Sequence, residues 1–328
     1  MILILTQLHD RTADAVCTRL SERGAEFTRF DPAEYPERAS LTVAFSSAGL
    51  ARLELERAGE RVDLRNLSAV WLRRPSLPVV AQHFGVRTKE YVEQECRELL
   101  RALYDLIDSR WVPGPPNVVE RAQLKLWQLQ LAAELGLTLP ETVVTNRPQE
   151  LKAFHERQPR LISKLAGATA FQRTLGRDFA RYTEPVSTHD LLHMQSLRHC
   201  PVTFQEAIDK ALEVRVTVVD GRIFAAEIHS QETIRTRQDW RRYDHAATRY
   251  ARHVLPNGVA AACLALVTRC GLVYGAIDLI LTPSGEYVFL ELNPAGEYGW
   301  IEERTGLEVT EAVCDLLTRE SQQARFTA

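Results

Sequence analysis

Hydrophobic and polar residues alternate along this chain with two periods, about 3.6 residues in some segments and two in others, which predicts both helices and strands. The elements predicted for the first third are a strand at 1–6, a helix at 12–24, a strand at 27–30, a hairpin of 41–45 with 53–55, a strand at 69–72 and a helix at 87–108. A strand, helix, strand order is typical of a parallel α/β domain. Prolines and a glycine at 113–117 break this pattern, so the first domain boundary is predicted there.

Strands dominate the chain from Val202 onward, and most of them are predicted to pair as hairpins. The elements predicted after residue 117 are a helix at 118–135, strands at 142–145 and 161–166, a hairpin or loop at 167–182, a helix at 187–199, strands at 213–219 and 222–228, a helix at 256–270, strands at 273–282 and 286–293, and a helix at 309–321. Asp220-Gly221 between two alternating segments is the strongest short-range hairpin signal. A mixed α/β (α+β) protein is therefore predicted.

Asp278, Glu291 and Asn293 stand on the last predicted hairpin and supply hard oxygen donors. If this hairpin turns between Ser284 and Gly285, Asp278 lies opposite Glu291, and the strand period places Asn293 on the same face. Directly opposed side chains have Cβ atoms about 5 Å apart, where two carboxylates repel each other unless positive charge lies between them. Such donors suit Mg²⁺ together with substrate phosphates. A solvated hairpin face is the alternative, but the apolar flanks of both strands argue against it.

Three basic residues are candidate phosphate contacts. Arg215 shares one face of its strand with Glu213, and its planar guanidinium matches phosphate oxygens; an ion pair of the two on a wet sheet face is the alternative. Lys164 lies in an apolar strand, where a lysine seldom stands without a partner. Lys125 lies in an apolar helix segment and could instead extend its ammonium group to solvent.

The composition argues against several classes of protein. With 328 residues the chain is long enough for two or three domains, and its 45% hydrophobic and 25% charged residues are ordinary for a globular protein. A formal net charge of −3 argues against nonspecific nucleic-acid binding. No apolar segment approaches the roughly 20 residues of a membrane span, and residues 1–5 lack the basic flank of a signal peptide. A cytoplasmic protein without membrane contact is therefore predicted.

Familiar short motifs are missing from the sequence. The six cysteines show no C-x-x-C spacing, so neither a zinc site nor a disulfide framework is indicated, and they are predicted to be small buried hydrophobic residues. The sequence has no P-loop motif, and no G-x-G-x-x-G follows its first strand. Neither G-x-S-x-G nor H-E-x-x-H occurs. Any nucleotide must therefore be held by other means.

The candidate residues, taken in order, resemble the ATP-grasp superfamily over roughly residues 118 to 315. This resemblance is carried by Lys125, Lys164, Phe204-Gln205-Glu206-Ala207-Ile208, Glu213-Val214-Arg215-Val216, Asp278 and Glu291-Leu292-Asn293. A narrower resemblance, to the graspetide synthetases of the microviridin type, extends over nearly the whole chain. It is carried by Thr6 to Asp10, Phe30-Asp31-Pro32, Val70-Trp71-Leu72-Arg73-Arg74-Pro75, Ser230-Gln231-Glu232-Thr233, Asp239-Trp240-Arg241 and Asn293-Pro294-Ala295-Gly296-Glu297-Tyr298-Gly299-Trp300.

The resemblance implies an ATP-grasp fold that binds ATP and Mg²⁺. Its three parts would be an N-terminal parallel α/β pre-grasp domain at 1–115, a central domain at 116–200 and a C-terminal antiparallel-sheet domain at 201–328. The central domain would carry the nucleotide lid and a surface for the leader of a precursor peptide. The C-terminal domain would carry the metal site.

The resemblance also implies roles for the residues. Asp278, Glu291 and Asn293 would hold one or two Mg²⁺ ions, and Arg215 would be catalytic at the γ-phosphate and the acyl phosphate. The implied ATP-binding residues are Lys125 and Lys164 at the α and β phosphates, Gln205, Glu206 and Ile208 at the adenine, and Glu213 at the ribose. For Glu206, an exposed acid at a domain junction is the alternative.

Substrate recognition is implied for three pairs of residues. Arg241, a second catalytic candidate, and Asp239 lie in a basic segment and would bind the substrate carboxylate or the phosphates, with a solvated basic loop as an equal alternative. Arg173 and Arg177 would meet an acidic core peptide, beside the helix at 187–199, though charged loop faces need no partner. Arg73 and Arg74 are adjacent on a strand, so on a regular strand at most one of them can face the cleft.

The implied activity is an ADP-forming ligation. An Asp or Glu side chain of a ribosomal precursor peptide would attack the ATP γ-phosphate, and a Ser or Thr hydroxyl or a Lys amine would displace phosphate to close an ester or amide ring. A homodimer is also suggested. The alternatives are an ATP-grasp ligase that joins an amino acid to a small molecule or a protein C-terminus, and a nucleotide-binding regulator without turnover. The intact set of metal and phosphate residues argues against the regulator.

Overall fold

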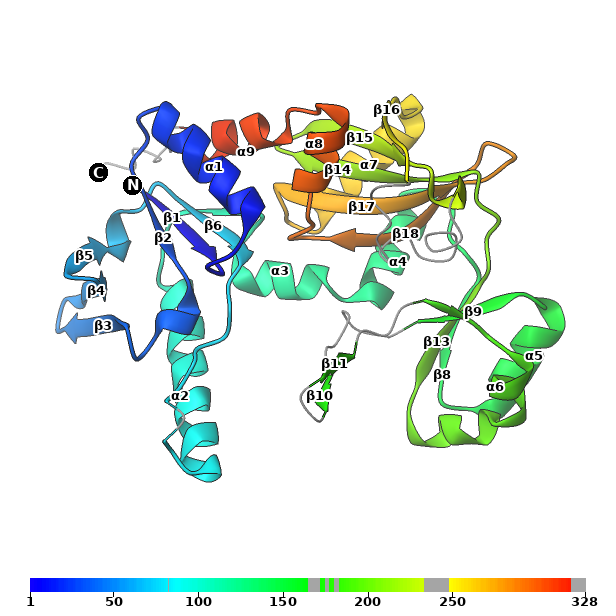
Figure 1. Cartoon of the computed structure of the whole chain (residues 1–328), viewed down its shortest axis with the longest axis horizontal. Helices are drawn as coiled ribbons and strands as arrows, with labels where there is room; N and C mark the ends of the chain where they lie inside the picture. The colour runs from blue at the N-terminus through cyan, green and yellow to red at the C-terminus, as the bar shows by residue number, and fades with distance from the viewer. Residues whose placement is uncertain (82, 165–171, 175–176, 180–182, 233–247, 320–328) are drawn as a thin grey trace.

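The computed structural model describes residues 1–81, 83–164, 172–174, 177–179, 183–232 and 248–319. Three larger sheets dominate the architecture (Figure 1). The N-terminal sheet lies at the left of the view, the C-terminal sheet at the upper right and the central sheet at the lower right. The arrangement is the mixed α/β fold that the sequence predicts.

The N-terminal sheet is parallel, as predicted, with strand order β2-β1-β6-β7. Its elements are β1 (Ile2–Thr6), α1 (Arg11–Glu22), β2 (Phe27–Phe30), β6 (Ala69–Arg74), α2 (Val86–Asp105) and β7 (Arg110–Val112). Every residue of β1 is buried, because α1 and α9 (Val309–Thr318) cover one face of the sheet. The other face packs on α2 and on a small sheet. That sheet consists of β3 (Ala39–Ser46), β4 (Gly49–Arg57) and β5 (Glu60–Asp63).

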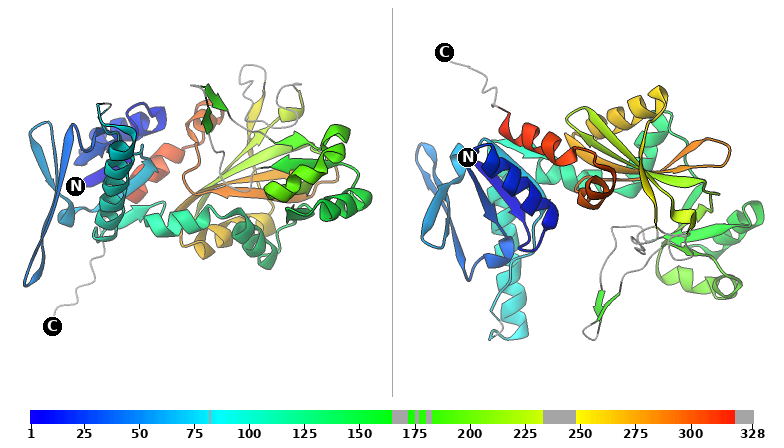
Figure 2. Two further views of the ribbon diagram at one scale, coloured as in Figure 1. Left: turned by 90° about the horizontal axis from the view of Figure 1, so that it is seen from below. Right: turned by 45° about the horizontal axis from the view of Figure 1, so that its top comes forward.

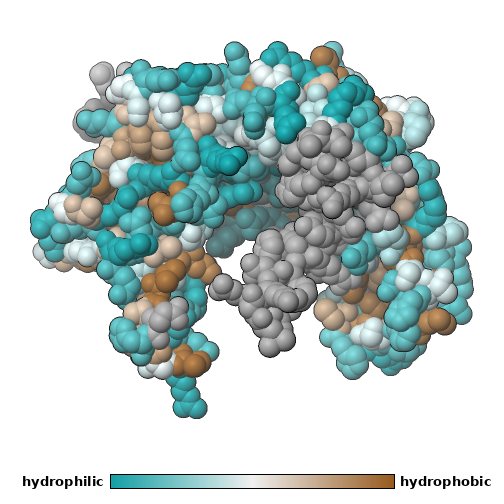
Figure 3. Space-filling model, in the orientation of Figure 1, coloured by the Kyte–Doolittle hydropathy of each residue, from teal (hydrophilic) through white to brown (hydrophobic). Residues whose placement is uncertain are grey.

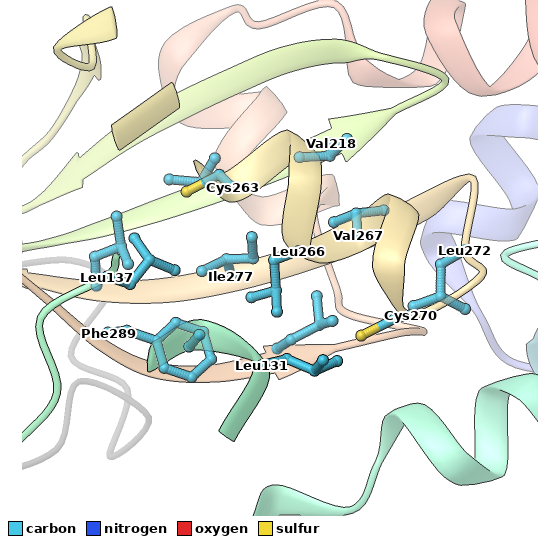
Figure 4. Close-up of a cluster of buried hydrophobic side chains, with 14 of the residues drawn as sticks. Leu131, Leu137, Val218, Cys263, Leu266, Val267, Cys270, Leu272, Ile277 and Phe289 are labelled. Atoms are coloured by element: carbon cyan, nitrogen blue, oxygen red, sulfur yellow. The ribbon is translucent and has the colours of Figure 1, made fainter. Parts of the chain in front are cut away.

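The C-terminal sheet is antiparallel, with strand order β16-β15-β14-β17-β18. Its strands are β14 (Leu212–Val219), β15 (Arg222–Ile228), β16 (Tyr250–His253), β17 (Tyr274–Leu281) and β18 (Tyr287–Asn293). Alternation sends Val214, Val216 and Val218 of β14 to one face, where α4 (Lys125–Glu134) and α7 (Asn257–Arg269) pack on them (Figure 4). The opposite face therefore carries Glu213, Arg215 and Asp278.

The central sheet has strand order β12-β9-β13-β8 and its own small core. Its elements are β8 (Thr142–Thr145), α5 (Pro148–Arg157), β9 (Leu161–Lys164), β12 (Glu184–Pro185) and β13 (Val202–Glu206). The boundary predicted at residue 200 falls before β13, whereas β13 is hydrogen-bonded to both β8 and β9. The central part therefore continues to Glu206.

The helix predicted at 118–135 is two helices, α3 (Pro116–Ala122) and α4, which are separated by Gln123 and Leu124. Both helices contribute to the core under the C-terminal sheet. The start of the predicted central domain therefore belongs to that core. The break also makes Lys125 the first residue of α4, next to β18.

The N-terminal and C-terminal sheets share one hydrophobic cluster. Val219, Tyr274 and Tyr298 pack in it with Ile2 and Ile4 of β1. Helix α9 lies against α1 in both views of Figure 2 and closes this cluster. The shared core fixes the position of β1 and β6 relative to β17.

The remaining helices and the cysteines agree only in part with the predictions. The helix predicted at 187–199 is α6 (Thr188–Leu192) followed by a 3-10 segment, Met194–His199, and neither α5 nor α8 (Gly299–Thr305) was predicted. Four of the six cysteines are buried as predicted, whereas Cys200 is exposed and Cys17 is half-buried. None of the helices in the described part of the chain is both long and apolar enough to cross a membrane.

Candidate active site

Asp278 and Glu291 face each other across β17 and β18, as predicted from the sequence. Asn293 follows on the same face, and its amide nitrogen lies 3.4 Å from Glu291 Oε1. We call Asp278, Glu291 and Asn293 the acidic wall. Its neighbour on β14 is Arg215, which pairs with Asp278 in the sheet register.

The predicted hairpin turn is wrong, although the predicted pairing is right. Leu281 pairs with Tyr287, so the turn is centred on Ser284 and not between Ser284 and Gly285. A register shift next to Asp278 restores the pairing, because β18 contains one additional residue, Leu290, at that point. Such an insertion is a β-bulge.

The bulge determines where Glu291 points. Phe289 and Leu292 both pack in the core on the helix side of the sheet, although they are three residues apart. In a regular strand, side chains on one face are two residues apart, so Glu291 would follow Phe289 toward the helices. The additional residue turns Glu291 to the opposite face, a common use of bulges near functional sites.

Each carboxylate of the acidic wall has its own basic partner. Arg215 Nη1 donates to both oxygens of Asp278 at 2.8 and 2.9 Å, and the two side chains are only 4% and 8% exposed. Lys125 Nζ lies 2.9 Å from Glu291 Oε2. Burial opposes the charge of Arg215, but Asp278 outweighs it and raises the arginine pKa. A wet sheet face, the alternative for Arg215 and Glu213, is wrong because both residues are buried.

The loop after Asn293 is fixed through three successive carbonyl groups. The bonds run from Arg73 Nη1 to Ala295 O (2.8 Å), from Tyr274 Oη to Gly296 O (2.6 Å) and from Arg215 Nη2 to Glu297 O (3.1 Å). Burial raises the pKa of Tyr274 to about 12, so its hydroxyl remains a donor at neutral pH. The loop passes so close to the sheet that a Cβ on Gly296 would lie 2.4 Å from that of Ala276.

Glu297 connects this loop to the N-terminal sheet. Its carboxylate accepts hydrogen bonds from Thr12 and Arg73, and Arg74 Nη1 lies 3.2 Å away. Arg73 is also 3.4 Å from Asp10. Burial favours the protonated form of Glu297, but Arg73, Thr12 and Arg74 outweigh burial and lower its pKa.

Arg73 and Arg74 reach the same carboxylate because the strand is not regular there. The pairing of β1 with β6 shifts register immediately before Thr6, which pairs with Arg74. The side chain of Arg73 is 2% exposed and is bonded within the protein, whereas that of Arg74 is 47% exposed. Arg74 is therefore the accessible one of the two arginines, and a contact of either with substrate stays a prediction.

Lys164 and Gln205 lie on one face of the central sheet. Leu161 and Phe204 point into the core on the helix side, so alternation sends Lys164 and Gln205 to the other face. Gln205 Nε2 donates to Thr142 Oγ1 at 2.9 Å. Gln205 Oε1 is buried and has no hydrogen-bond partner among the described residues. It is an acceptor suited to an amino group such as that of adenine.

The other predicted nucleotide residues lie along the connection between the central and C-terminal sheets. Glu206 exchanges hydrogen bonds with the backbone of Glu141, at 2.9 and 3.3 Å, and Ile208 follows in the loop to β14. Glu213 is buried, with Lys210 Nζ 2.7 Å from its Oε1. Burial raises the pKa of Glu213, and Lys210 opposes this shift.

Four predicted site residues have no described side chain. Asp239 and Arg241 lie outside the described residues. Arg173 and Arg177 belong to β10 (Gln172–Thr174) and β11 (Arg177–Phe179), whose backbones pair antiparallel. Their roles therefore stay predictions.

Sequence reasoning assigned no role to Glu297, Tyr274 or Gln128. Glu297 lies in the motif at 293–300, but nothing in its spacing pairs it with β6. Gln128 interrupts an apolar helix segment, and this was a usable signal for a buried polar contact.

The acidic wall has the chemistry of a magnesium site. Carboxylate and amide oxygens are hard ligands, and Mg²⁺ usually takes one or two carboxylates with phosphate oxygens. Among the described residues, no group of three or more His, Cys, Asp or Glu side chains is placed to hold a metal. Two carboxylates and an amide therefore fit a metal that arrives with a nucleotide. Figure 3 shows the molecule hollowed beside the N-terminal sheet, with hydrophilic side chains along the upper part of the hollow.

Comparisons with known proteins identify the family of this chain. A family model described as the MvdD pre-ATP-grasp domain matches residues 1–118. The chain is 33% identical to the macrocyclase MdnB from Microcystis aeruginosa MRC, with a TM-score of 0.81 over 97% of this chain and 99% of that chain. The chain belongs to the graspetide synthetases, the ATP-grasp macrocyclase family. The predicted ATP-grasp fold and ligase class are thereby confirmed.

Two further solved structures resemble this graspetide synthetase. The ATP-grasp ligase from Chryseobacterium gregarium, in complex with ADP and with a leader and core peptide, is 30% identical, with a TM-score of 0.88 over 96% of each chain. The macrocyclase MdnC from Microcystis aeruginosa MRC, bound with the precursor peptide MdnA, is 28% identical. Its TM-score is 0.85, over 96% of this chain and 98% of that chain. No curated protein sequence matches the chain.

The charge of Glu297 gives a pH-dependent prediction. Because its folded pKa is lowered, its stabilisation is complete above the ordinary carboxyl pKa of about 4.3 and is lost as the pH falls through the folded value. Glu297→Gln should lower the free energy of unfolding at neutral pH by about 1.5–3 kcal/mol, since charged hydrogen bonds to Arg73 are weakened.

The measurement is urea unfolding of both proteins across the acid range. The difference between them should shrink as the pH falls below about 4.3. Glu303→Gln, an exposed glutamate on the following helix α8, serves as the control and should leave stability unchanged. A constant difference at every pH would contradict the role of the Glu297 charge.

Proposed function

We propose that this graspetide synthetase activates Asp or Glu side chains of a ribosomal precursor peptide as acyl phosphates. It then joins them to Ser or Thr hydroxyls or to Lys amines, as macrocyclic esters or amides. The observation that carries the proposal is the acidic wall, in which Asp278 and Glu291 are each balanced by a basic partner. Precursor peptides bound to two full-length relatives support a peptide substrate.

The first step brings two anions together, the substrate carboxylate and the ATP γ-phosphate. A carboxylate oxygen attacks phosphorus, and the bond to the β-phosphate oxygen breaks to release ADP. We assign one or two Mg²⁺ ions to Asp278, Glu291 and Asn293, where the metal would neutralise phosphate charge. Lys125 lies at the partly exposed side of the wall, so it can leave Glu291 for a phosphate. Lys164 would reach the phosphates from the central sheet.

The second step releases phosphate from the activated carbonyl. A hydroxyl or amine of the peptide attacks the acyl carbon and loses its proton. The bond from this carbon to the phosphate oxygen breaks, and inorganic phosphate leaves. We assign Arg215 to the charge on the transferring and departing phosphate. Its hydrogen bonds to Asp278 and to Glu297 O hold the guanidinium between the acidic wall and the loop after Asn293. Arg241 is predicted to assist it.

The adenosine part would be read by residues of the central part. Gln205 Oε1, a buried acceptor without a hydrogen-bond partner in the described part of the chain, supports an adenine contact, with Glu206 and Ile208 beside it. Glu213 would hold the ribose hydroxyls.

Peptide recognition would use the carboxyl end of β6. Arg74 is exposed at this end. In the strand order β2-β1-β6-β7, the strand that follows β1 in the chain lies on one side of it and β6 lies on the other. The carboxyl ends of two such strands are a usual place for ligands. Arg173, Arg177 and Asp239 stay predicted contacts of the precursor, and a homodimer stays a prediction.

The decisive assay follows ATP use and peptide mass together. With Mg²⁺ and an acidic peptide bearing Ser, Thr or Lys, encoded beside this chain, we expect ADP to form and the peptide to lose one water per ring. A peptide whose Asp and Glu are replaced by Asn and Gln is the control and should support neither. ADP formation that does not depend on the peptide would instead favour a ligase acting on a small molecule or a protein C-terminus.

Arg215 can be tested without removing its charge. Replacement by alanine would leave the buried Asp278 carboxylate unpaired, at a cost of about 3–5 kcal/mol, so Arg215→Lys is the better variant. We expect ADP binding to persist and ring formation to fall about 10²- to 10³-fold, as for other lost transition-state donors.

The matched control is Arg222→Lys, on the neighbouring strand. Arg222 is exposed and bonded to Asp315, so this variant should form rings at the normal rate. Ring formation by Arg215→Lys at the rate of this control would contradict the role of Arg215.

A further inference from the structure

Gln128 is a buried polar residue in the core beneath β18. It is 2% exposed, and a buried amide without hydrogen bonds lowers stability. Its amide makes three bonds to the backbone. Nε2 donates to Ala122 O at 2.6 Å and to Leu292 O at 2.7 Å, and Oε1 accepts from Leu292 N at 2.9 Å. Both amide hydrogens and one oxygen lone pair are therefore used.

The two hydrogen bonds between Gln128 and the backbone of Leu292 replace those that a neighbouring strand would make. Strand β18 lies at the edge of the sheet, where backbone groups lack a strand partner on one side. At Leu292 the side chain of Gln128 pairs with both the N–H and the C=O. Farther along the same edge, Phe289 N donates to Thr138 O at 2.8 Å.

These two outward N–H groups enclose the bulge. In a regular strand, N–H groups that point to the same edge are two residues apart. Phe289 and Leu292 are three apart, and Leu290, the additional residue, lies between them. Gln128 and Thr138 therefore hold β18 from outside in the irregular register that turns Glu291 to the acidic wall.

We infer that Gln128 is a positioning residue for the metal site. Its hydrogen bonds hold the bulge and thereby keep Glu291 on the face of the sheet that carries the acidic wall. The inference rests on the proposed function, in which Glu291 is a metal ligand. The bond to Ala122 O adds to this role, because Ala122 is the last residue of α3. One amide thus joins the end of α3 to the strand that carries the metal ligand.

The test measures how strongly Mg²⁺ tightens the binding of a fluorescent ADP analogue to the full-length chain, from titrations with Mg²⁺ and with EDTA. Gln128→Met keeps the side-chain length but removes all three hydrogen bonds. We expect it to reduce the tightening about tenfold, a typical coupling between two ligands, with a smaller change in EDTA. Gln130→Met is the matched control, because Gln130 is exposed on the same helix and bonded to Glu134. It should change nothing.

A second arm shows whether Gln128 acts through Glu291. Glu291→Gln alone should lose most of the tightening by Mg²⁺, and adding Gln128→Met to it should cause no further loss of what remains. A further loss in the double variant would overturn the inference. If Gln128→Met does not fold, Gln128→Leu is measured with the same expectations, since leucine likewise makes none of the three hydrogen bonds.

The outcomes separate the inference from the proposed function. An unchanged Mg²⁺ effect in Gln128→Met, or equal weakening with Mg²⁺ and with EDTA, overturns the positioning role while the metal assignment stands. An unchanged Mg²⁺ effect in Glu291→Gln overturns the metal assignment and the role of Gln128 with it.

Discussion

The repulsion between two carboxylates placed face to face in an apolar sheet is the constraint on which the rest of the site depends. Asp278 and Glu291 are neighbours in the β17–β18 register, and each needs positive charge beside it. Arg215 supplies it to Asp278 from within the sheet, and Lys125 supplies it to Glu291 from the start of α4. The first pair is nearly inaccessible, and the second is partly exposed. We therefore expect the arriving metal and phosphates to rearrange Lys125 and to leave Arg215 in place.

The same arginine connects the metal site to the rest of the fold. Arg215 is bonded to Asp278 and to the carbonyl of Glu297, whose carboxylate binds Arg73 on the N-terminal sheet. A continuous set of hydrogen bonds and ion pairs thus runs from the acidic wall to the carboxyl end of β6. Arg74 lies at the exposed end of this set. A substrate bound at the N-terminal sheet would therefore meet the phosphates at a fixed distance.

Most of the fold and the composition of the site could be predicted, whereas the irregularities that build the site could not. The alternation of β14 predicts its two faces, and the resemblance names the acidic wall. The sequence does not show that Leu290 is an inserted residue, because a regular strand with a shifted turn gives the same pairing of Asp278 with Glu291. Nor does it show that a second register shift brings Arg73 and Arg74 to one carboxylate. Both depend on contacts between distant segments, such as that of Gln128 with Leu292.

The most direct test of carboxylate activation follows one oxygen atom. If the Asp and Glu side chains of the precursor peptide carry ¹⁸O in both oxygens, attack on the γ-phosphate moves one labelled oxygen onto phosphorus. We predict that mass spectrometry finds one ¹⁸O atom in the inorganic phosphate for each ring closed, with ADP as the second product. Unlabelled phosphate, or label recovered in AMP, would contradict an acyl phosphate formed at the acidic wall.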